Sequence, residues 1–349
     1  MAAVRQKLLR WYDRAARDLP WRHTRDPYAI WVSEVMLQQT RVETVIPYYQ
    51  RFLERFPTPR ALADADEDTV LSQWSGLGYY RRARLLHAGV REVVAQYGGK
   101  VPEDADSRRC LPGVGRYTAG AIGSIAFDKA EPIVDGNVTR VLARLFRIDT
   151  PVGASATTRR LWEEAARLVP GDRPGDLNQA LMELGATICT PKQPGCGSCP
   201  VAGECRAYAS DEIDTLPVPR ARKPPKEVEL AAVVATRGRA SEPEVWLLRS
   251  EGSLFGGLWG LPMLGREAFD QRDARGALRE ARISARLDPE PAAQVEHVLT
   301  HRRLRIDVFR ATAARGTESE TLRRFNPRQL GRVGISTLTK KLLASTLPA

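Results

Sequence analysis

The sequence lacks any long apolar run. None of its 349 residues belongs to a stretch approaching the ~18 apolar residues of a membrane helix, and residues 1–19 lack the continuous apolar core of a signal peptide. We therefore expect a cytoplasmic protein that does not contact membranes. Apolar residues still make up 43% of the chain, which is ordinary for a soluble protein, and the length predicts two or three domains.

Cysteine is scarce, with five copies in the chain. In a cytoplasmic protein so few cysteines rarely form disulfides, so we expect no disulfide framework. Four of them follow the spacing C-x6-C-x2-C-x5-C, namely Cys189, Cys196, Cys199 and Cys205. Thiolates clustered in a short loop predict a metal centre, and both zinc and an iron–sulfur cluster fit this spacing. Cys110 stands apart from the others, and we expect it to be a small buried apolar residue.

Acidic residues are outnumbered. The chain has 42 Asp and Glu against 53 Lys and Arg, a net charge of +11 and a pI near 9.7. The imbalance is strong in residues 301–349, which hold 11 Lys and Arg against 3 Asp and Glu. This balance fits a polyanionic partner such as nucleic acid, although charge alone does not identify one.

Strand-like patterns are absent from the first 210 residues. Apolar residues recur there at helical spacing, in particular over residues 1–20, 28–49 and 155–188, so we predict an all-α region. Residues 211–228 are rich in Pro, Lys and Arg and predict a linker. Beyond them, alternating apolar segments around one helical segment (265–287) predict an α+β domain.

One segment, residues 111–137, combines a glycine turn with an acid. Gly113 and Gly115 frame a valine, and we expect Thr118 to cap the helix that follows. Such a turn presents N–H groups and a helix N-terminus to an anion such as phosphate. With Asp135 close behind, the segment predicts a phosphate-binding hairpin beside a carboxylate. The alternative is an ordinary helix–turn–helix corner with a surface aspartate.

A carboxylate, Glu34, interrupts the apolar run near the start of residues 28–49. Glu34 lies between Trp31 and Val35, and burial would raise its pKa toward the range that a general acid needs at neutral pH. The alternative is that Glu34 lies on the polar edge of an amphipathic helix. A second glycine turn, at residues 76–81, predicts another contact to a phosphate backbone.

Seven motifs occur in the order in which one known family has them. They are LPWR (19–22), SEVMLQQT (33–40), GLGYYRRAR (76–84), LPGVGRYTAGAI (111–122), VDGNVTRVLAR (134–144), NQALMELGATICT (178–190) and the cysteine loop. Together they resemble the endonuclease III superfamily of helix–hairpin–helix DNA glycosylases, and in detail the MutY-type adenine DNA glycosylases.

This resemblance implies a multidomain protein with an all-α helix–hairpin–helix glycosylase core and a Nudix-like α+β C-terminal domain. The core spans residues 1–210, with a six-helix barrel over about 21–127 and a cluster domain made of about 1–20 and 128–210. A linker over 211–228 then leads to the Nudix-like domain at 229–345. The four clustered cysteines are implied to hold a [4Fe-4S] cluster in a structural role.

The resemblance also implies a reaction. A monomeric, nucleoid-associated enzyme would hydrolyse the N-glycosidic bond of adenine mispaired with 8-oxoguanine or guanine in double-stranded DNA, after flipping the base out of the duplex. This bond breaks through an oxocarbenium-like state, so an acid is needed for the leaving base and a carboxylate for the sugar cation. By resemblance Glu34 is the acid and Asp135 the carboxylate, and Tyr117 and Asn137 support them.

Further residues are implied to contact the substrate. The adenine pocket would be lined by Trp21, Arg22, Leu37 and Gln179. Gln39 and Tyr79 would enter the gap in the duplex, and Gly113 and Gly115 would contact its backbone.

The hairpin lacks a lysine. Tyr117 stands where the bifunctional relatives carry a Schiff-base lysine, so the resemblance implies no strong strand-cleaving lyase activity. Two alternatives remain open, a pyrimidine glycosylase and lyase of endonuclease III type and a non-catalytic lesion-binding protein. The missing lysine argues against the first, and the presence of both Glu34 and Asp135 argues against the second.

The C-terminal region lacks the acids of a Nudix hydrolase. Gln271, Ile283 and Ser284 stand where the metal-binding acids of a Nudix box would lie, so we expect no pyrophosphate hydrolysis. By resemblance the loop Leu299, Thr300 and His301 inspects 8-oxoguanine, with Leu299 in place of an aromatic residue. The alternative is that His297 and His301 are ordinary strand residues.

Overall fold

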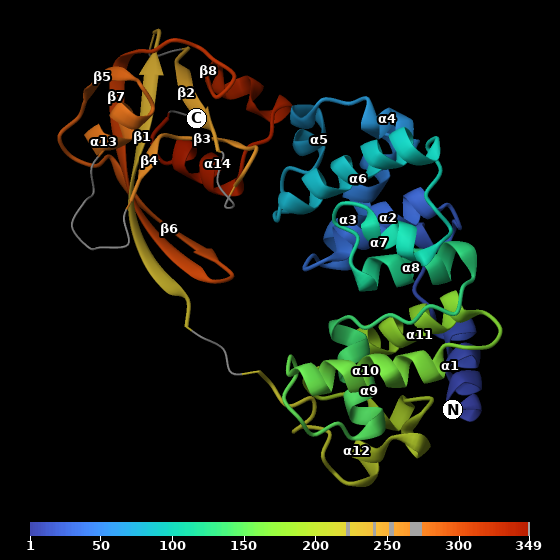
Figure 1. Ribbon diagram of the computed structural model, residues 1–349. Helices are drawn as coiled ribbons and strands as arrows, with labels where there is room; N and C mark the ends of the chain where they lie inside the picture. The colour runs from blue at the N-terminus through green and yellow to red at the C-terminus, as the bar shows by residue number, and fades with distance from the viewer. Residues whose placement is uncertain (221–223, 240–241, 251–254, 266–273, 348–349) are drawn as a thin grey trace. The chain divides into compact units, whose positions relative to one another are not determined.

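The computed structural model describes residues 1–220, 224–239, 242–250, 255–265 and 274–347 (Figure 1). Two compact units are present. Unit 1 comprises Met1–Ala63 and Ala88–Arg222, and unit 2 comprises Asp64–His87 and Lys223–Ala349.

Unit 1 is helical, as predicted. Its main helices are α1 (Ala2–Ala15), α2 (Pro27–Leu37), α3 (Val42–Arg55), α7 (Ala105–Cys110), α8 (Arg116–Phe127), α9 (Gly136–Phe146), α10 (Ser155–Leu168) and α11 (Pro174–Thr187). Helix α11 packs against α1, α8 and α9, while α2 packs against α8 and α3. Helices α8 and α11 thus bring α2 and α9 into one core, although these two helices lie about a hundred residues apart. None of the described helices has the length and apolar character that a membrane span requires.

The helical stretch expected over residues 28–49 consists of two helices. Helix α2 ends at Leu37, and α3 begins at Val42. Between them Gln39 adopts φ +58°, a left-handed conformation that breaks the helical hydrogen-bond ladder. The stretch is therefore helical as expected, but the break inside it was missed.

Two smaller expectations near the hairpin were wrong. Helix α8 is preceded by Gly115, so Thr118 lies inside its first turn and is buried. The reason is that Gly113, at φ +76°, turns the chain early enough for the helix to begin at Arg116. Cys110 is exposed rather than buried, because it ends α7 on its solvent side while Leu111 enters the core.

Unit 2 contains a mixed β-sheet. Strand β1 (Lys226–Arg237) pairs in parallel with β7 (Arg302–Arg315), and β6 (Ala293–Leu299) forms an antiparallel hairpin with β7. On the other side of β1 lies β2 (Glu244–Arg249), which pairs with β3 (Trp259–Gly260) and β8 (Leu322–Phe325). The remaining described strands are β4 (Met263–Leu264) on β1 and β5 (Ser284–Leu287) on β7. The α+β prediction is confirmed.

The predicted helix over residues 265–287 is shorter in the described residues. Helix α13 covers Ala274–Glu280, and the sequence after it forms strand β5. Arg282 at φ +55° separates the two elements, and the alternating side chains of β5 then favour pairing with β7. The expected position of Gln271 lies outside the described residues.

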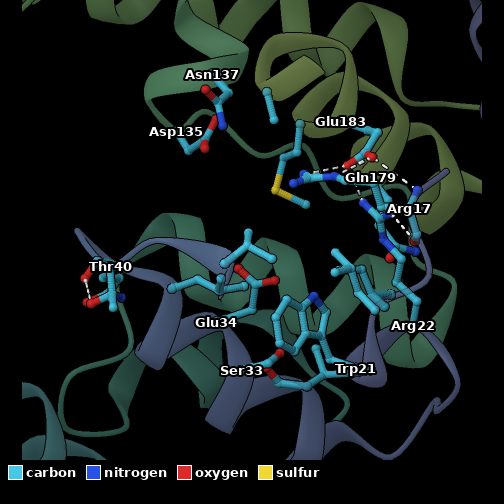
Figure 2. A pocket seen from close by; sticks show the side chains of 18 of the residues that line it. Arg17, Trp21, Arg22, Ser33, Glu34, Thr40, Asp135, Asn137, Gln179 and Glu183 are labelled. Atoms are coloured by element: carbon cyan, nitrogen blue, oxygen red, sulfur yellow. Dashed lines mark hydrogen bonds and ion pairs between the residues drawn. The ribbon is translucent and has the colours of Figure 1, made fainter. Parts of the chain in front are cut away.

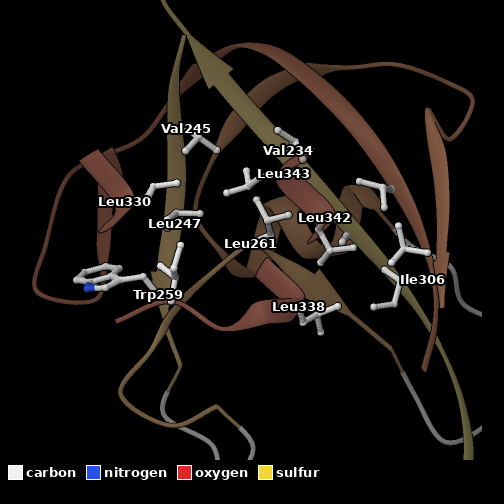
Figure 3. Close-up of a cluster of buried hydrophobic side chains, with 14 of the residues drawn as sticks. Val234, Val245, Leu247, Trp259, Leu261, Ile306, Leu330, Leu338, Leu342 and Leu343 are labelled. Atoms are coloured by element: carbon white, nitrogen blue, oxygen red, sulfur yellow. The ribbon is translucent and has the colours of Figure 1, made fainter. Parts of the chain in front are cut away.

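Both faces of this sheet carry apolar cores. Ala232 and Val234 of β1 point to one face, where they join the cluster that includes Leu338 and Leu342 of α14 (Thr337–Ala344), shown in Figure 3. The alternate residues of β1 join Ala277 and other residues of α13 in a second cluster. The period-2 alternation of β1 therefore buries both of its faces, one under each helix.

Helices α9 and α11 lie in close contact at Gly185. A Cβ atom there would lie 2.7 Å from the Cβ atom of Asn137 and 3.0 Å from its Cα atom. We therefore expect Gly185→Ala to lower the free energy of unfolding of the protein by about 1–3 kcal/mol, despite the ~1 kcal/mol that alanine gains in a helix. Urea unfolding followed by circular dichroism measures the change.

The matched control is Gly203→Ala. Gly203 has open space where its Cβ would stand, so its substitution should change the free energy of unfolding by less than about 0.5 kcal/mol. Equal effects of the two substitutions would show that the contact at Asn137 is not tight.

Candidate active site

A cavity of about 540 Å³ lies in unit 1, among side chains of α2, α8, α11 and the start of α9 (Figure 2). It brings together nine of the residues that the sequence predicted: Trp21, Arg22, Glu34, Leu37, Gln39, Tyr117, Asp135, Asn137 and Gln179. In Figure 2, Asp135 and Asn137 lie on one side of the cavity, and Glu34 and Trp21 lie on the other. Gly113, Gly115, Tyr79 and the loop 299–301 are not among the lining residues.

Glu34 is buried, with 4% of its surface exposed, so it does not lie on a polar helix edge. Its position is set by α2, which begins cleanly because Asp26 caps it and Pro27 occupies its first turn. The Tyr117 hydroxyl donates a hydrogen bond of 2.6 Å to Oε2 of Glu34. Burial raises the pKa of Glu34 to about 7; the Tyr117 hydrogen bond lowers it, and the charge of Asp135 raises it further. Near neutral pH, Glu34 can therefore both carry and release a proton.

Tyr117 lies in the first turn of α8, directly after the glycine hairpin. Burial, and then the charges of Glu34 and Asp135, raise the pKa of its hydroxyl well above the usual value. The phenol therefore stays protonated and remains a donor to Glu34. Its oxygen also approaches the sulfur of Met182 at 3.4 Å.

Asp135 caps helix α9. Its Oδ1 accepts a hydrogen bond of 2.7 Å from the backbone N–H of Val138, as N-cap aspartates do. Burial raises the pKa of Asp135, while the N–H groups of Val138 and Asn137 and the charge of Arg140 oppose that shift. The side chain of Asn137 accepts a 2.8 Å hydrogen bond from Arg140, whose Nε also donates to the carbonyl of Cys189 at 2.6 Å. The start of α9 thus contacts both the cavity and the cysteine loop.

Glu183 and Arg17 line the cavity but were not predicted. Glu183 is 1% exposed and accepts hydrogen bonds from Arg17 Nε at 2.8 Å and from Arg22 Nη2 at 2.7 Å. Burial alone would raise the pKa of Glu183, but the bonds from Arg17 and Arg22 lower it to about 2. The only signal in the sequence was that Glu183 lies inside the motif NQALMELG, four residues after the predicted Gln179.

The glycine hairpin presents bare backbone to solvent. Gly113 and Gly115 are both exposed, and a Cβ on Gly115 would meet no atom within 4 Å. The exposed turn leads directly into the N-terminus of α8, where backbone N–H groups lack helical partners. The expected phosphate contact of this turn stays a prediction, and the free N–H groups at the start of α8 are compatible with it.

In unit 2, the structure brings together two of the predicted DNA contacts. The Tyr79 hydroxyl and Thr300 Oγ1 lie 2.6 Å apart in a hydrogen bond, and both residues are exposed. Thr300 and His301 form the turn between β6 and β7, while Leu299 packs partly against the core of the sheet. His297 lies within β6 opposite Leu304, and burial lowers its pKa. His297 is therefore a strand residue, whereas His301 belongs to the exposed turn.

The four clustered cysteines are free thiols at the end of α11 and in the turns that follow. Burial raises the pKa of Cys199 to about 11; hydrogen bonding to the backbone of Val201 opposes this shift, and the charges of the other three thiols add to it. Arg144 Nη1 lies 3.4 Å from the sulfur of Cys189. Within the described ranges, no three His, Cys, Asp or Glu side chains are arranged as a ready-made metal site. The donor chemistry, four mutually interacting thiols, nevertheless fits an iron–sulfur centre.

Comparison with known proteins identifies the family. Residues 32–167 match the HhH-GPD superfamily of base excision DNA repair proteins, and residues 239–345 match the NUDIX domain. The adenine DNA glycosylase of Rattus norvegicus is 41% identical to this chain over 362 residues, which cover 88% of this chain and 70% of the rat protein. The chain belongs to the adenine DNA glycosylase family.

Two solved structures of DNA glycosylases resemble part of this chain in fold. A thermostable thymine-DNA glycosylase has 32% sequence identity and a TM-score of 0.54, covering 60% of this chain and 96% of its own. An endonuclease III bound to DNA has a TM-score of 0.51 at 23% identity, covering 60% of this chain and 95% of its own. The second likeness shows the shared helical fold alone.

The hydrogen bond from Tyr117 to Glu34 should set the pH dependence of base release. If protonated Glu34 is the acid, the rate of base release should fall as pH rises through about 7, where Glu34 loses its proton. Tyr117→Phe removes a hydrogen bond that stabilises the ionised form of Glu34. The falling limb should therefore move to higher pH in this variant. Single-turnover rates of adenine release, measured between pH 5 and 9, give the pH at which the rate falls.

Tyr28→Phe is the matched control. Tyr28 lies in the same helix as Glu34, but its hydroxyl donates to the carbonyl of Phe56, away from the cavity. In this variant the rate of adenine release should fall at the same pH as in the wild type. A limb in Tyr117→Phe that stays in place or moves to lower pH contradicts the proposed coupling of Tyr117 to Glu34.

Proposed function

We propose that this protein hydrolyses the N-glycosidic bond of adenine mispaired with 8-oxoguanine or guanine in double-stranded DNA. The observation that carries the proposal is a buried carboxyl, Glu34, with a pKa of about 7, in a cavity that it shares with Asp135. A flipped base needs such a cavity, because its bond to the sugar cannot be reached inside the stacked duplex.

In this proposal Glu34 protonates N7 of the flipped adenine. The electrons of the glycosidic bond then pass into the protonated base, which leaves as neutral adenine. Because Tyr117 donates to Oε2 of Glu34, the other oxygen, Oε1, is the one left to carry the proton. After bond cleavage the ionised Glu34 can take a proton from the water that attacks the sugar.

Asp135 faces the positive charge that develops on the sugar carbon. A carboxylate there lowers the energy of the oxocarbenium-like state and can form a transient covalent bond to it. Because Asp135 also caps α9 through Val138, its carboxylate is oriented before the substrate arrives. Asn137 supports this position from the first turn of the same helix.

The base itself would lie against Trp21, Leu37 and Gln179, which line the cavity. The ion pair with Glu183 holds the guanidinium of Arg22 in place at the cavity. Gln179 and Arg22 can therefore hydrogen-bond the edge of a flat base, while Trp21 and Leu37 offer it apolar contact.

The enzyme is proposed to be monofunctional. A lyase reaction needs an amine that forms an imine with the sugar, and Tyr117 has none. No lysine occurs among the described residues that line the cavity. The expected product is therefore an abasic site in an intact strand.

Recognition of the opposite base is assigned to unit 2. The hydroxyls of Tyr79 and Thr300 are exposed and adjacent, so together they can hydrogen-bond a base edge, with His301 contacting the backbone. In unit 1, the hairpin glycines Gly113 and Gly115 are proposed to contact the DNA backbone. Gln39 is exposed at the rim of the cavity in unit 1 and would enter the gap left by the flipped base. Leu299 packs on the sheet and lacks the aromatic ring of its counterparts.

Cys189, Cys196, Cys199 and Cys205 are proposed to hold a [4Fe-4S] cluster. When bound, the cluster would cross-link the loop after α11, and it takes no part in the reaction as proposed. We further propose that the protein acts as a monomer on chromosomal DNA in the cytoplasm.

One assay tests the proposed reaction. Single-turnover reactions would use duplexes with adenine opposite 8-oxoguanine, adenine opposite guanine, thymine opposite guanine, and a thymine-glycol control. We expect adenine release, with strand breaks appearing only after alkali. Breaks without alkali would favour an endonuclease III-type lyase, and tight binding without any release would favour a non-catalytic lesion-binding protein. Release of thymine in place of adenine would contradict the proposed substrate.

Glu34→Gln tests the assigned acid. The amide cannot deliver the proton, so adenine release should fall by at least about a hundredfold. Binding to the same duplex should remain within about threefold of the wild type, because the side chain keeps its size. A release rate within tenfold of the wild type would contradict the role of Glu34.

A further inference from the structure

The segment that precedes Asp135 is irregular but fixed. Residues 128–134 connect α8 to α9 without forming a helix or strand, yet Ile133 is fully buried. Because irregular backbone has no hydrogen-bond ladder of its own, the position of such a segment depends on the side chains that hold it. Two buried side chains from other elements do so.

The first is Arg108 of α7, which is fully buried. Its guanidinium donates to the carbonyl of Pro102 at 3.2 Å and to that of Ala119 in α8, also at 3.2 Å. Its Nη2 also forms an ion pair of 2.5 Å with Oε1 of Glu131, whose side chain is 22% exposed. One guanidinium thus ties the irregular segment to the helices on either side of the glycine hairpin.

The second is Asn178 of α11, which is also fully buried. Its Nδ2 donates to Ser124 Oγ of α8 and to the main-chain carbonyl of Glu131, both at 2.8 Å. Glu131 is therefore held twice, by its carboxylate and by its backbone. The residue after Asn178, Gln179, lines the cavity.

Close packing leaves the segment no room to shift toward α8. A Cβ on Gly120 would lie 2.5 Å from the carbonyl oxygen of Pro132, so the two backbones are nearly in contact. Near Asn178, a Cβ on Gly175 would collide with the carbonyl oxygen of Ser124. The same two glycine contacts bring α8, α11 and the segment together.

We propose that Arg108, Glu131 and Asn178 are positioning residues for Asp135. Glu131 lies four residues before Asp135, so its two attachments set where the chain enters the first turn of α9. A misplacement of about 1 Å in a reacting group can cost about a hundredfold in rate. The inference rests on the catalytic role proposed above for Asp135.

The test compares Glu131→Ala with Glu131→Gln. The alanine variant removes the partner of Arg108, whereas glutamine keeps an oxygen that can accept from Nη2. We expect Glu131→Ala to release adenine about ten to a hundred times more slowly than the wild type in single-turnover reactions. Glu131→Gln should remain within about threefold of the wild type. Rates are measured at least 20 °C below the melting temperature of each variant, so that only folded protein is compared.

Binding separates positioning from a general structural effect. The ligand is a duplex with 2′-fluoro-2′-deoxyadenosine opposite 8-oxoguanine, in which fluorine disfavours the sugar cation and so prevents release. The dissociation constant of Glu131→Ala for this duplex should stay within about twofold of the wild type. A loss of binding with an unchanged release rate would overturn the inference, and so would a wild-type release rate in folded Glu131→Ala.

Lys129→Ala is the matched control from the same segment. Lys129 forms an exposed ion pair of 2.6 Å with Glu103, and the two side chains are 48% and 60% exposed. Its loss should leave release within threefold of the wild type, and a loss equal to that of Glu131→Ala would overturn the inference. If Glu131→Ala does not fold, Asn178→Ser, which removes the second attachment, replaces it with the same expected results.

Asp135→Asn distinguishes the two proposals. Wild-type release in Asp135→Asn would contradict the role of Asp135 itself. Slow release in Asp135→Asn together with wild-type release in Glu131→Ala would overturn only the positioning role.

Discussion

The hydrogen bond from Tyr117 to the buried Glu34 is the interaction on which the chemistry of this cavity depends. A carboxyl held away from water prefers to keep its proton, and burial alone would make it too weak an acid to give that proton up readily. The phenol moderates this effect by stabilising the ionised form, and the result is a pKa of about 7. Because Tyr117 follows directly on the glycine hairpin, the turn that suits a DNA phosphate also determines where the phenol stands.

The same cavity contains a second buried carboxyl with the opposite behaviour. Glu183 is as well buried as Glu34, but it contacts two arginines, and its pKa is lowered to about 2. One carboxyl is therefore able to donate a proton near neutral pH, while the other remains a fixed negative charge. The difference between the two pKa values follows from the hydrogen-bond and ion-pair partners of each residue, since both are glutamates and both are buried.

Much of the site could be predicted from the sequence, because seven ordered motifs carry its residues. They led to Glu34 and Asp135, which no local pattern could have paired across about a hundred residues. The residues that were missed depend on tertiary contacts. Glu183 resembles any acid on a helix surface until Arg17 and Arg22 are seen beside it, and the ion pair of Arg108 with Glu131 leaves no pattern at all.

The fold was predicted less well at its turns than in its regular elements. The helical and α+β regions followed from apolar spacing, which reflects which side of each element is buried. The break after α2 could not be predicted from apolar spacing. It depends on a left-handed backbone conformation at Gln39, which glutamine rarely adopts and which composition cannot reveal. Thr118 illustrates the same limit, since the start of α8 was set by the exact turn at Gly113 two residues before Gly115.

The exposure of Cys110 has a practical consequence. The other four thiols are half-buried, so a maleimide dye added in limited amount should react first at Cys110, at the end of α7. The next residue, Leu111, begins the glycine hairpin. A fluorophore attached there would report on the surroundings of the hairpin from outside it, and would allow the arrival of a duplex to be followed in real time without adding a new cysteine to the chain.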